Sequence, residues 1–240
     1  MKSYRALDSS RIAPNKDARH PFDLQWGVDT GGYLSPKEII TGHQHDAFCY
    51  GYSAIAPSVF DESLRRWRAT LSGNGANAAA YSFVDIGAGK GRALLLASQL
   101  PFRRVIGVEF SAELAEIAES NVARWRKVAH PRTELRVFHQ DALAFRWPRA
   151  PLLVYLYNPF QCDLLERLLE RIERWAKAGA RAGSRGVDLL YVNPICADTL
   201  SRRRTFSLLW TDRVDMSLAD QAADPYGTTF DRVSCYRLRR

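Results

Sequence analysis

Short hydrophobic runs alternate with helix-like apolar periods along residues 61–240. Apolar runs predict buried strands, and apolar residues three or four positions apart predict amphipathic helices. The expected strands are 81–87, 103–110, 133–141, 151–158 and 187–194, and the expected helices are 61–71, 92–100, 111–128 and 163–178. Strands that alternate with helices form a parallel sheet with helices on both faces. We therefore expect a doubly wound α/β fold.

Two further strands are expected at the end of the chain, at 204–210 and 230–238. The segment between them lacks the apolar period of a long helix, so we expect the two strands to form an antiparallel hairpin at one edge of the sheet. No internal repeat or second domain is evident.

The segment before residue 61 follows a different pattern. Residues 1–20 are polar, with mixed charge, and are expected to be loose. Residues 21–60 are rich in glycine and aromatic residues that follow no single period. We expect residues 1–60 to be an N-terminal leader that packs on the core as a lid, and residues 61–240 to form the domain.

Composition narrows the class of protein. The chain has 240 residues, 46% of them hydrophobic, and 34 basic against 26 acidic residues give a net charge of +8. A basic protein can bind nucleic acid, but the arginines are scattered and form no stripe, so this partner has no further support. The apolar runs are too short to span a membrane. The four cysteines show no CxxC spacing, and we expect a soluble, reduced, cytoplasmic protein without a disulfide framework.

Three glycines, Gly87, Gly89 and Gly91, follow the first expected strand in "FVDIGAGKGRALLLAS". A dinucleotide site has the pattern G-x-G-x-x-G, and a P-loop ends in G-K-[ST]. Here Gly91 directly follows Lys90, so neither phosphate-binding pattern fits. The glycines indicate a ligand that lies close to the backbone and carries no phosphate.

S-adenosylmethionine has these properties, and its cationic end favours nearby carboxylates. Asp85 lies two residues before the first glycine. Glu109 ends the second strand, where it can accept hydrogen bonds from both ribose hydroxyls. Asp141 follows the third strand, where it can accept a hydrogen bond from the adenine amino group. The Ala142 N–H can donate a hydrogen bond to an adenine ring nitrogen.

The motifs "VDIGAGKG", "VIGVEFS", "HQDAL" and "LYNPF" resemble those of class I (Rossmann-like) S-adenosylmethionine-dependent methyltransferases, over residues of about 60–240. The leader, with "WG-DT-G" and "YGY", is similar to that of bacterial methyltransferase-domain proteins. The resemblance implies a seven-stranded sheet with a reversed edge strand. It also implies that the cofactor is bound by Asp85, Gly87, Ala88, Gly89, Gly91, Glu109, Phe110, Asp141, Ala142 and Asn158.

The fourth strand ends in "LYNPFQ", at the position that faces the transferred methyl group in this family. Amino-methyltransferases often have Asn/Asp-Pro-Pro-aromatic there, whereas this chain has one proline in Asn158-Pro159-Phe160. The asparagine and a backbone carbonyl can accept hydrogen bonds from a target amine, and an aromatic face tolerates the cationic product. The alternative is a plain strand-to-helix turn with Asn158 at the start of the next helix.

The order "CYGY", glycine loop, "GVE" and "YNPF" is also similar to that of histone lysine methyltransferases of the disruptor-of-telomeric-silencing type. Tyr52 stands where those proteins have Glu, and Pro159 where they have Asn, so lysine specificity does not carry over. This resemblance implies that Tyr50 and Tyr52 form part of the wall of the cofactor site. The expected catalytic residues are Asn158, Pro159, Phe160 and Tyr52. Aromatic packing of the leader on the domain is the alternative role for both tyrosines.

His43 and His45 in "GHQHD" raise the question of a metal or a general base. No second ligand pair completes a zinc site, so no metal is expected and a surface loop is favoured.

The sequence therefore predicts a methyltransferase that uses S-adenosylmethionine, with S-adenosylhomocysteine as product. The unidentified acceptor is expected to be an amine, on a protein lysine or a small molecule, rather than a hydroxyl. One alternative, a nicotinamide-dependent oxidoreductase, needs a third glycine one place later and leaves Asp141 without a role. The other, a non-catalytic binding module, is expected to lose Glu109 or the glycines. The sequence does not determine the oligomeric state.

Overall fold

A computed structural model describes residues 19–71, 77–179 and 186–239. Nearly all of the segment expected to be loose, residues 1–20, lies outside the described residues.

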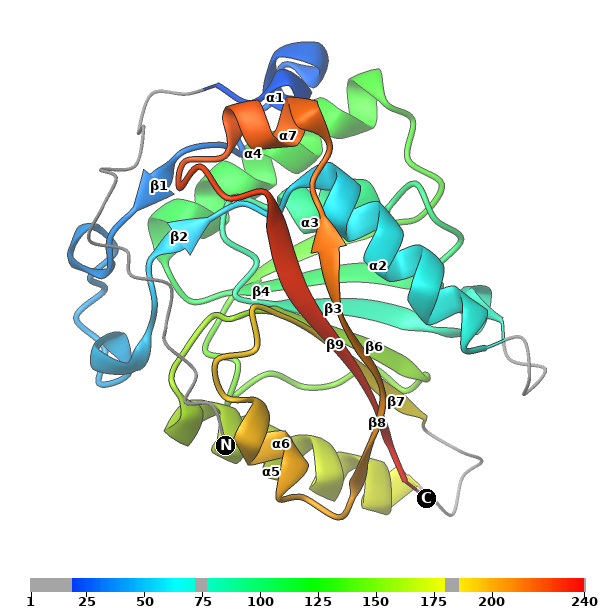
Figure 1. Ribbon diagram of the computed structural model, residues 1–240. Coiled ribbons are helices and arrows are strands. Elements are labelled where there is room, and N and C mark those ends of the chain that lie inside the picture. Colours follow the sequence, from blue (N-terminus) through cyan, green and yellow to red (C-terminus); the bar gives the residue numbers. More distant parts are fainter. Residues whose placement is uncertain (1–18, 72–76, 180–185, 240) are drawn as a thin grey trace.

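The core is a seven-stranded sheet in the order β5-β4-β3-β6-β7-β9-β8 (Figure 1). Its strands are β3 (Ser82–Ile86), β4 (Arg104–Glu109), β5 (Leu135–His139), β6 (Leu152–Tyr157), β7 (Val187–Val192), β8 (Phe206–Asp215) and β9 (Phe230–Leu238). The first five are parallel, whereas β9 runs antiparallel to both β7 and β8. The expected mostly parallel sheet with an antiparallel edge hairpin is confirmed.

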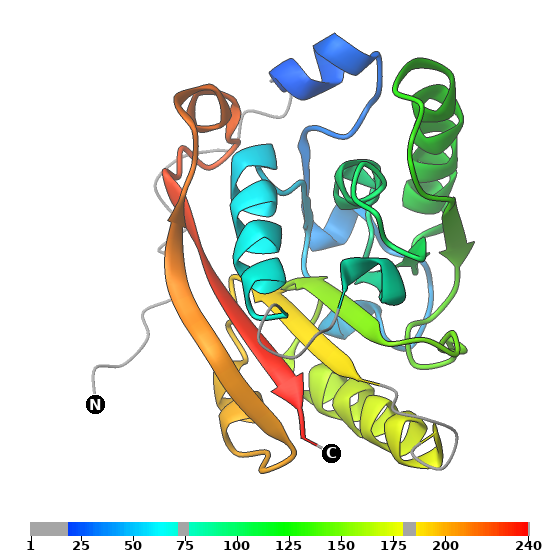
Figure 2. The same cartoon turned by 90° about the vertical axis from the view of Figure 1, so that its right-hand side faces the viewer.

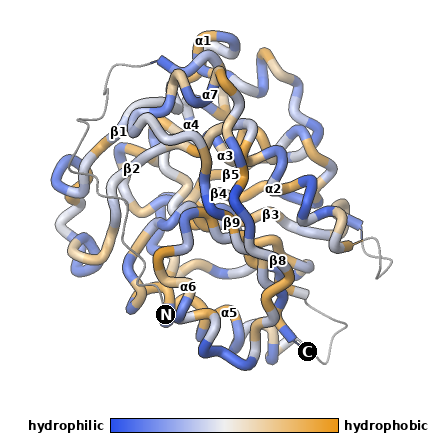
Figure 3. The backbone as a smooth tube through the Cα atoms, viewed as in Figure 1, coloured by the Kyte–Doolittle hydropathy of each residue, from blue (hydrophilic) through white to orange (hydrophobic). Residues whose placement is uncertain are grey.

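Helices cover both faces of the sheet (Figures 1 and 2). One face carries α2 (Pro57–Ala69), α3 (Arg92–Ala97) and α4 (Ala112–Val128), and the other carries α5 (Cys162–Gly179) and α6 (Ala197–Ser201). Two buried hydrophobic clusters fill the space on the two faces. Hydrophobic and hydrophilic residues alternate along α5, as expected for a helix with one buried side (Figure 3).

The hydrophobic pattern of the sequence does not predict several short helices. The helices α1 (Pro21–Trp26), α6 and α7 (Leu218–Ala223) have five or six residues each, which is too short to show a helical period. α2 begins at Pro57 instead of residue 61, because proline suits the first turn of a helix and Val59 and Phe60 are buried.

Buried polar contacts hold parts of the leader together and join Thr30 of the leader to the core. The Thr30 backbone N–H donates a 3.1 Å hydrogen bond to Asp23 Oδ2, and the Thr30 carbonyl accepts a 2.6 Å bond from the Tyr52 hydroxyl. Arg92 Nε, from α3, donates a 2.7 Å bond to Thr30 Oγ1. The strands β1 (Tyr33–Leu34) and β2 (Tyr52–Ser53) pair with each other in a small antiparallel sheet. In the described part of the leader, Thr30 is therefore held both by Asp23 and Tyr52 of the leader and by Arg92 of the domain.

The structure corrects the expectation of reduced cysteines for one pair. Cys162, at the start of α5, and Cys196, just before α6, form a disulfide, while Cys49 and Cys235 are free. The two bonded residues are separated by 34 positions, so spacing gave no signal. The bond joins the loops that follow β6 and β7. Among the described helices, none combines the length and the hydropathy of a membrane span.

Candidate functional site

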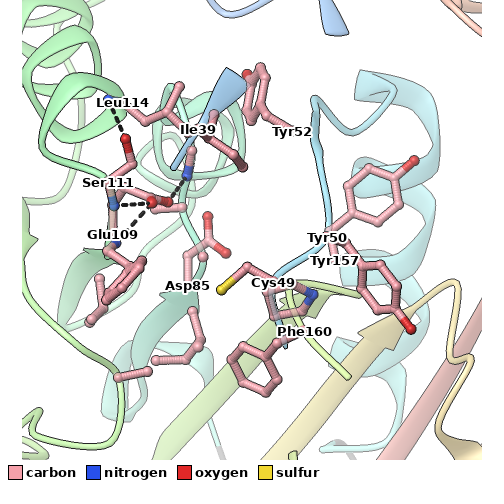
Figure 4. A pocket seen from close by; sticks show the side chains of 18 of the residues that line it. Ile39, Cys49, Tyr50, Tyr52, Asp85, Glu109, Ser111, Leu114, Tyr157 and Phe160 are labelled. Atoms are coloured by element: carbon pink, nitrogen blue, oxygen red, sulfur yellow. Dashed lines mark hydrogen bonds between the residues drawn. The ribbon is translucent and has the colours of Figure 1, made fainter. Parts of the chain in front are cut away.

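A cavity opens at the carboxyl ends of β3, β4, β5 and β6, on either side of the point where the strand order reverses. Ligands bind at this place in open α/β sheets. Its empty space is about 1140 Å³, including space open to solvent. The leader forms one wall, and Figure 4 shows Asp85 and Cys49 between Glu109 on one side and Tyr50 and Tyr157 on the other.

The glycine loop borders the cavity and packs closely against two other residues that line it, Pro159 and Tyr52. Gly87, Gly89 and Gly91 all have positive φ, at 76°, 54° and 91°. A Cβ on Gly87 would lie 2.6 Å from Pro159 Cβ, and one on Gly89 would overlap the Tyr52 ring. Two of the glycines are therefore needed both for their backbone conformation and for the close approach of Pro159 and Tyr52.

Glu109 ties the glycine loop to the start of α4. Its Oε2 accepts a 2.7 Å hydrogen bond from the Gly89 N–H, and its Oε1 accepts 2.8 Å bonds from the Phe110 and Ser111 N–H groups. Burial raises the pKa of this carboxyl, and the three backbone donors lower it in part. A carboxylate has about four acceptor positions, so Glu109 can accept a further bond from a ligand hydroxyl.

Asp85 is deeply buried and lines the same cavity. Burial, and then the charge of Glu109, raise its pKa well above the ordinary value. Ala88, between the first two glycines, also lines the cavity, and its N–H donates a 3.2 Å bond to the Val108 carbonyl.

Asp141 and Ala142 line the cavity just after β5, three strands away in the sheet order from β6, which carries Tyr157. Asp141 Oδ1 accepts a 2.8 Å bond from the Leu143 N–H, which fixes the turn after β5. Among the described residues, no hydrogen bond engages the Ala142 N–H, so this donor is available to a ligand. Phe110 also lines this region, and its ring centroid lies 4.9 Å from that of His43.

His45 connects the leader to Asp141. Its Nδ1 lies 3.2 Å from Asp141 Oδ2, and its Nε2 lies 3.2 Å from Arg167 Nη1. A guanidinium only donates, so Nε2 is the acceptor and Nδ1 carries the proton directed at Asp141. Possible ligand atoms of His43, His45 and Asp141 all lie within 4.8 Å of one another. Binding a cation there would have to overcome the neighbouring Arg167 charge, and the absence of a metal stays a prediction.

The residues expected to bind the acceptor do not all face the cavity. Pro159 and Phe160 line it, whereas Asn158 is not among the lining residues. Asn158 Oδ1 accepts a 3.0 Å bond from the Tyr191 hydroxyl, and its backbone has a φ of 43°. The Pro159 carbonyl accepts a 3.1 Å bond from the Tyr50 N–H. Both acceptor groups of the Asn-Pro turn are thus engaged within the protein.

Tyr52 lines the cavity with its ring, since its hydroxyl is turned to the Thr30 carbonyl. Lys90 Nζ lies 5.8 Å from the centroid of this ring and 2.9 Å from Asp29 Oδ1. The leader, Tyr52 and the glycine loop therefore form one packed unit.

The lining residues that sequence reasoning missed include four with a polar or reactive side chain, Cys49, Ser53, Tyr155 and Tyr157. The tyrosines lie in a continuous apolar run that predicts only a buried strand. The hydropathy pattern gave no sign that these two tyrosines line a cavity.

No protein-family model matches the chain, and a search of curated proteins found no match. Solved structures do match. TrmN from Thermus thermophilus is 18% identical, with a TM-score of 0.49, over 77% of this chain and 49% of that one. Magnesium protoporphyrin IX methyltransferase (ChlM) from Synechocystis PCC 6803, with bound SAM, is 14% identical, with a TM-score of 0.49, over 74% of this chain and 79% of that one. The chain thus spans about half the length of the first of these proteins and most of the second.

Proposed function

We propose that this protein is a methyltransferase that uses S-adenosylmethionine. The observation that carries the proposal is the convergence of three carboxyl groups, Asp85, Glu109 and Asp141, on one cavity beside a bare glycine loop. They come from the ends of three adjacent strands. Such a site suits a ligand with cationic groups, a ribose and an adenine.

The cofactor is expected to lie along this row of acids. Glu109 would accept hydrogen bonds from the ribose, while Asp141 and the Ala142 N–H would meet the adenine, with Phe110 beside it. The methionine part would lie beside the glycine loop, where Gly87 and Gly89 border the same cavity as Asp85.

The site suits a phosphate-bearing cofactor less well. Phosphates bind free backbone N–H groups at a helix N-terminus. Here the Gly89 N–H already donates to Glu109, and the Gly91 N–H donates a 2.9 Å bond to the Ala88 carbonyl. The guanidinium that lines the cavity, Arg92, is bonded to Thr30 and to the Ile55 carbonyl. These contacts argue against the nicotinamide-dependent alternative.

The acceptor is proposed to be an amine, on a small molecule or a protein lysine. S-adenosylmethionine supplies a methyl group activated by its sulfonium sulfur, so the protein mainly has to position the amine. Tyr52, Pro159 and Phe160 form the wall, and the aromatic rings of Tyr52 and Phe160 tolerate the cationic product. Asn158 would act indirectly, by holding the turn through its hydrogen bond with Tyr191. The cytoplasmic location stays a prediction.

Calorimetric titration with S-adenosylmethionine, S-adenosylhomocysteine and NAD tests the proposal. We expect saturable binding of the two adenosyl-sulfur ligands and none of NAD. The Asp141→Ala variant should bind both more weakly, whereas Asp163→Ala, which removes an exposed acid from the start of α5, should bind them as the wild type does. Binding of NAD instead would contradict the proposal. Binding of the adenosyl-sulfur ligands without transfer to any amine would favour the non-catalytic alternative.

A further inference from the structure

The three glutamates and the three arginines of α5 lie on different sides of the helix. In "LLERLLERIERWAK" each arginine directly follows a glutamate, so the sequence shows no arginine stripe. Neighbouring residues of a helix point about 100° apart, whereas residues three or four positions apart share one side. The helix therefore gathers the acids on one side and the bases on the next. The acids are Glu166, Glu170 and Glu173, and the bases are Arg167, Arg171 and Arg174.

An arginine from outside the helix neutralises the acids. Arg203 Nη1 lies 3.0 Å from Glu173 Oε2. Its Nη2 lies 3.3 Å from Glu166 Oε1 and 3.8 Å from Glu170 Oε1. Arg203 follows α6, which lies beside α5 (Figure 1). The glutamates are therefore directed to α6 and not to the arginines of their own helix.

The arginines of α5 form no ion pair within the described part of the chain, and their partners are neutral. Arg167 Nη1 lies 3.2 Å from His45 Nε2, and Arg171 Nη2 donates a 3.2 Å hydrogen bond to the Phe145 carbonyl. Arg171 Nε is buried and has no partner there. Arg167 and Arg174 are exposed. Like charges on one side of a helix repel one another, so an anion from outside the chain would stabilise them.

These arginines line a second pocket, which adjoins the cavity described above. It has about 390 Å³ of empty space, including space open to solvent, and Leu143 and Glu170 complete its lining. Leu143 lines the larger cavity as well, so the two spaces are neighbours. Along the helix axis the arginines are about 6 Å and 4.5 Å apart. Such a row of charges matches an extended polyanion better than a single small anion.

An exposed aromatic side chain lies near the arginines. Phe138, on the edge strand β5, is 38% exposed, and its ring centroid lies 5.8 Å from that of Phe145. Phe145 is the residue whose carbonyl accepts the hydrogen bond from Arg171. Proteins bind single-stranded nucleic acid with positive charges that contact phosphates and with aromatic rings on which bases stack. An acidic peptide would use the arginines and leave the ring without a role.

We propose that the arginine side of α5, together with Phe138, binds a single strand of nucleic acid. Guanidinium groups donate paired hydrogen bonds to phosphate oxygens, and the Phe138 ring offers a surface for a base. Because Leu143 borders both spaces, the strand would pass the edge of the larger cavity. This inference goes beyond the proposed function and does not depend on it, since the strand needs neither the cofactor nor the acceptor site.

Fluorescence anisotropy tests the proposal with a labelled single-stranded RNA of about 20 nucleotides and with DNA of the same sequence. We expect a dissociation constant of about 1–100 µM at about 0.1 M salt. The logarithm of the association constant should fall with the logarithm of salt concentration with a slope of about −2, because three phosphate contacts each contribute about −0.7.

Two variants separate charge from stacking. Arg174→Gln removes an exposed guanidinium whose described bond is to the Glu170 carbonyl of the same helix. It should weaken binding about fivefold at about 0.1 M salt and make the slope shallower by about 0.7. Phe138→Ala should weaken binding about tenfold and leave the slope unchanged, because it removes no charge. Arg68→Gln, at an exposed position of α2 on the opposite face of the sheet, and Leu218→Ala, at an exposed position of α7, are the matched controls and should change neither quantity.

Each outcome supports or overturns the proposal. Equal losses in Arg174→Gln and Arg68→Gln would show that binding follows net charge alone and would overturn it. Equally strong competition by poly-glutamate, with no effect of Phe138→Ala, would assign the surface to an acidic protein. Failure of both oligonucleotides to bind also overturns it and leaves the proposed function, which cofactor titration tests, intact. Thermal unfolding at the wild-type temperature would show that a lost affinity reflects the surface and not the fold.

Discussion

The Gly89 backbone N–H donates a 2.7 Å hydrogen bond to Glu109 Oε2, across 20 positions of sequence. This contact joins the glycine loop after β3 to the acid that ends β4. Glu109 therefore has two roles, as a candidate ribose ligand and as the residue that fixes the loop. The loop is so closely covered by Tyr52 that Gly89 has no room for a side chain.

Gly89→Ala should therefore cost more stability than a glycine replacement elsewhere. Gly42 is a matched control, because its φ is also positive, at 82°, and a Cβ there would meet nothing within 4 Å. Alanine in this backbone region costs about 1–2 kcal/mol in both variants. We expect an additional loss of about 1–3 kcal/mol for Gly89→Ala, where Tyr52 must move. Urea denaturation of both variants measures the difference, and equal losses would contradict the close packing of Tyr52.

The buried contact of Arg92 with the leader should control how firmly the leader is attached. Arg92 Nη2 lies 3.5 Å from Asp23 Oδ1, and both side chains are almost fully buried. Arg92→Leu would leave the Asp23 charge without compensation, at a cost of about 3–5 kcal/mol. We expect faster proteolytic cleavage within residues 19–55 and weaker binding of S-adenosylhomocysteine. Arg65→Leu, which removes an exposed arginine from α2, should change neither. A cleavage rate equal to that of the wild type would show that other contacts hold the leader.

The disulfide between Cys162 and Cys196 should be detectable and stabilising. Two thiols should react in the unfolded, non-reduced protein and four after reduction. The Cys196→Ser variant should lose about 3–4 kcal/mol of unfolding free energy, because the bond closes a loop of 34 positions. Cys235→Ser, at a buried free cysteine, provides a control for the loss of a thiol in the core. Four reactive thiols without reduction would show that the pair is not bonded.

Asp231 should make stability depend on pH. Burial raises its pKa to about 6 from the ordinary 3.8, although Asn193 Nδ2 donates a 2.6 Å bond to its Oδ1. The folded state therefore holds this proton more tightly than the unfolded state does. Its contribution is complete below pH 3.8 and is lost as pH rises through about 6, a change of about 3 kcal/mol. Asp231→Asn should remove this fall in stability. The test is to measure the free energy of unfolding of the wild type and of the variant across that pH range and to compare the two profiles. Parallel profiles would contradict the raised pKa.

The order of strands and helices in the domain could be predicted from the sequence, because buried strands and amphipathic helices have distinct hydrophobic periods. The pattern of α5 and the acids at the strand ends are cases where local sequence is sufficient. Asp85, Glu109 and Asp141 could be placed near one another because the carboxyl ends of parallel strands share one edge of the sheet.

Other features depend on contacts between distant segments, which no local pattern records. The pairing of Cys162 with Cys196 arises because the loops after β6 and β7 are neighbours in space. Asn158 is turned to Tyr191, and Tyr155 lines the cavity, because the packing of β6 against β7 and β3 sets the directions of their side chains. Sequence therefore determined the fold and the row of acids, whereas tertiary packing decided which side chains face the cavity and which stabilise its walls.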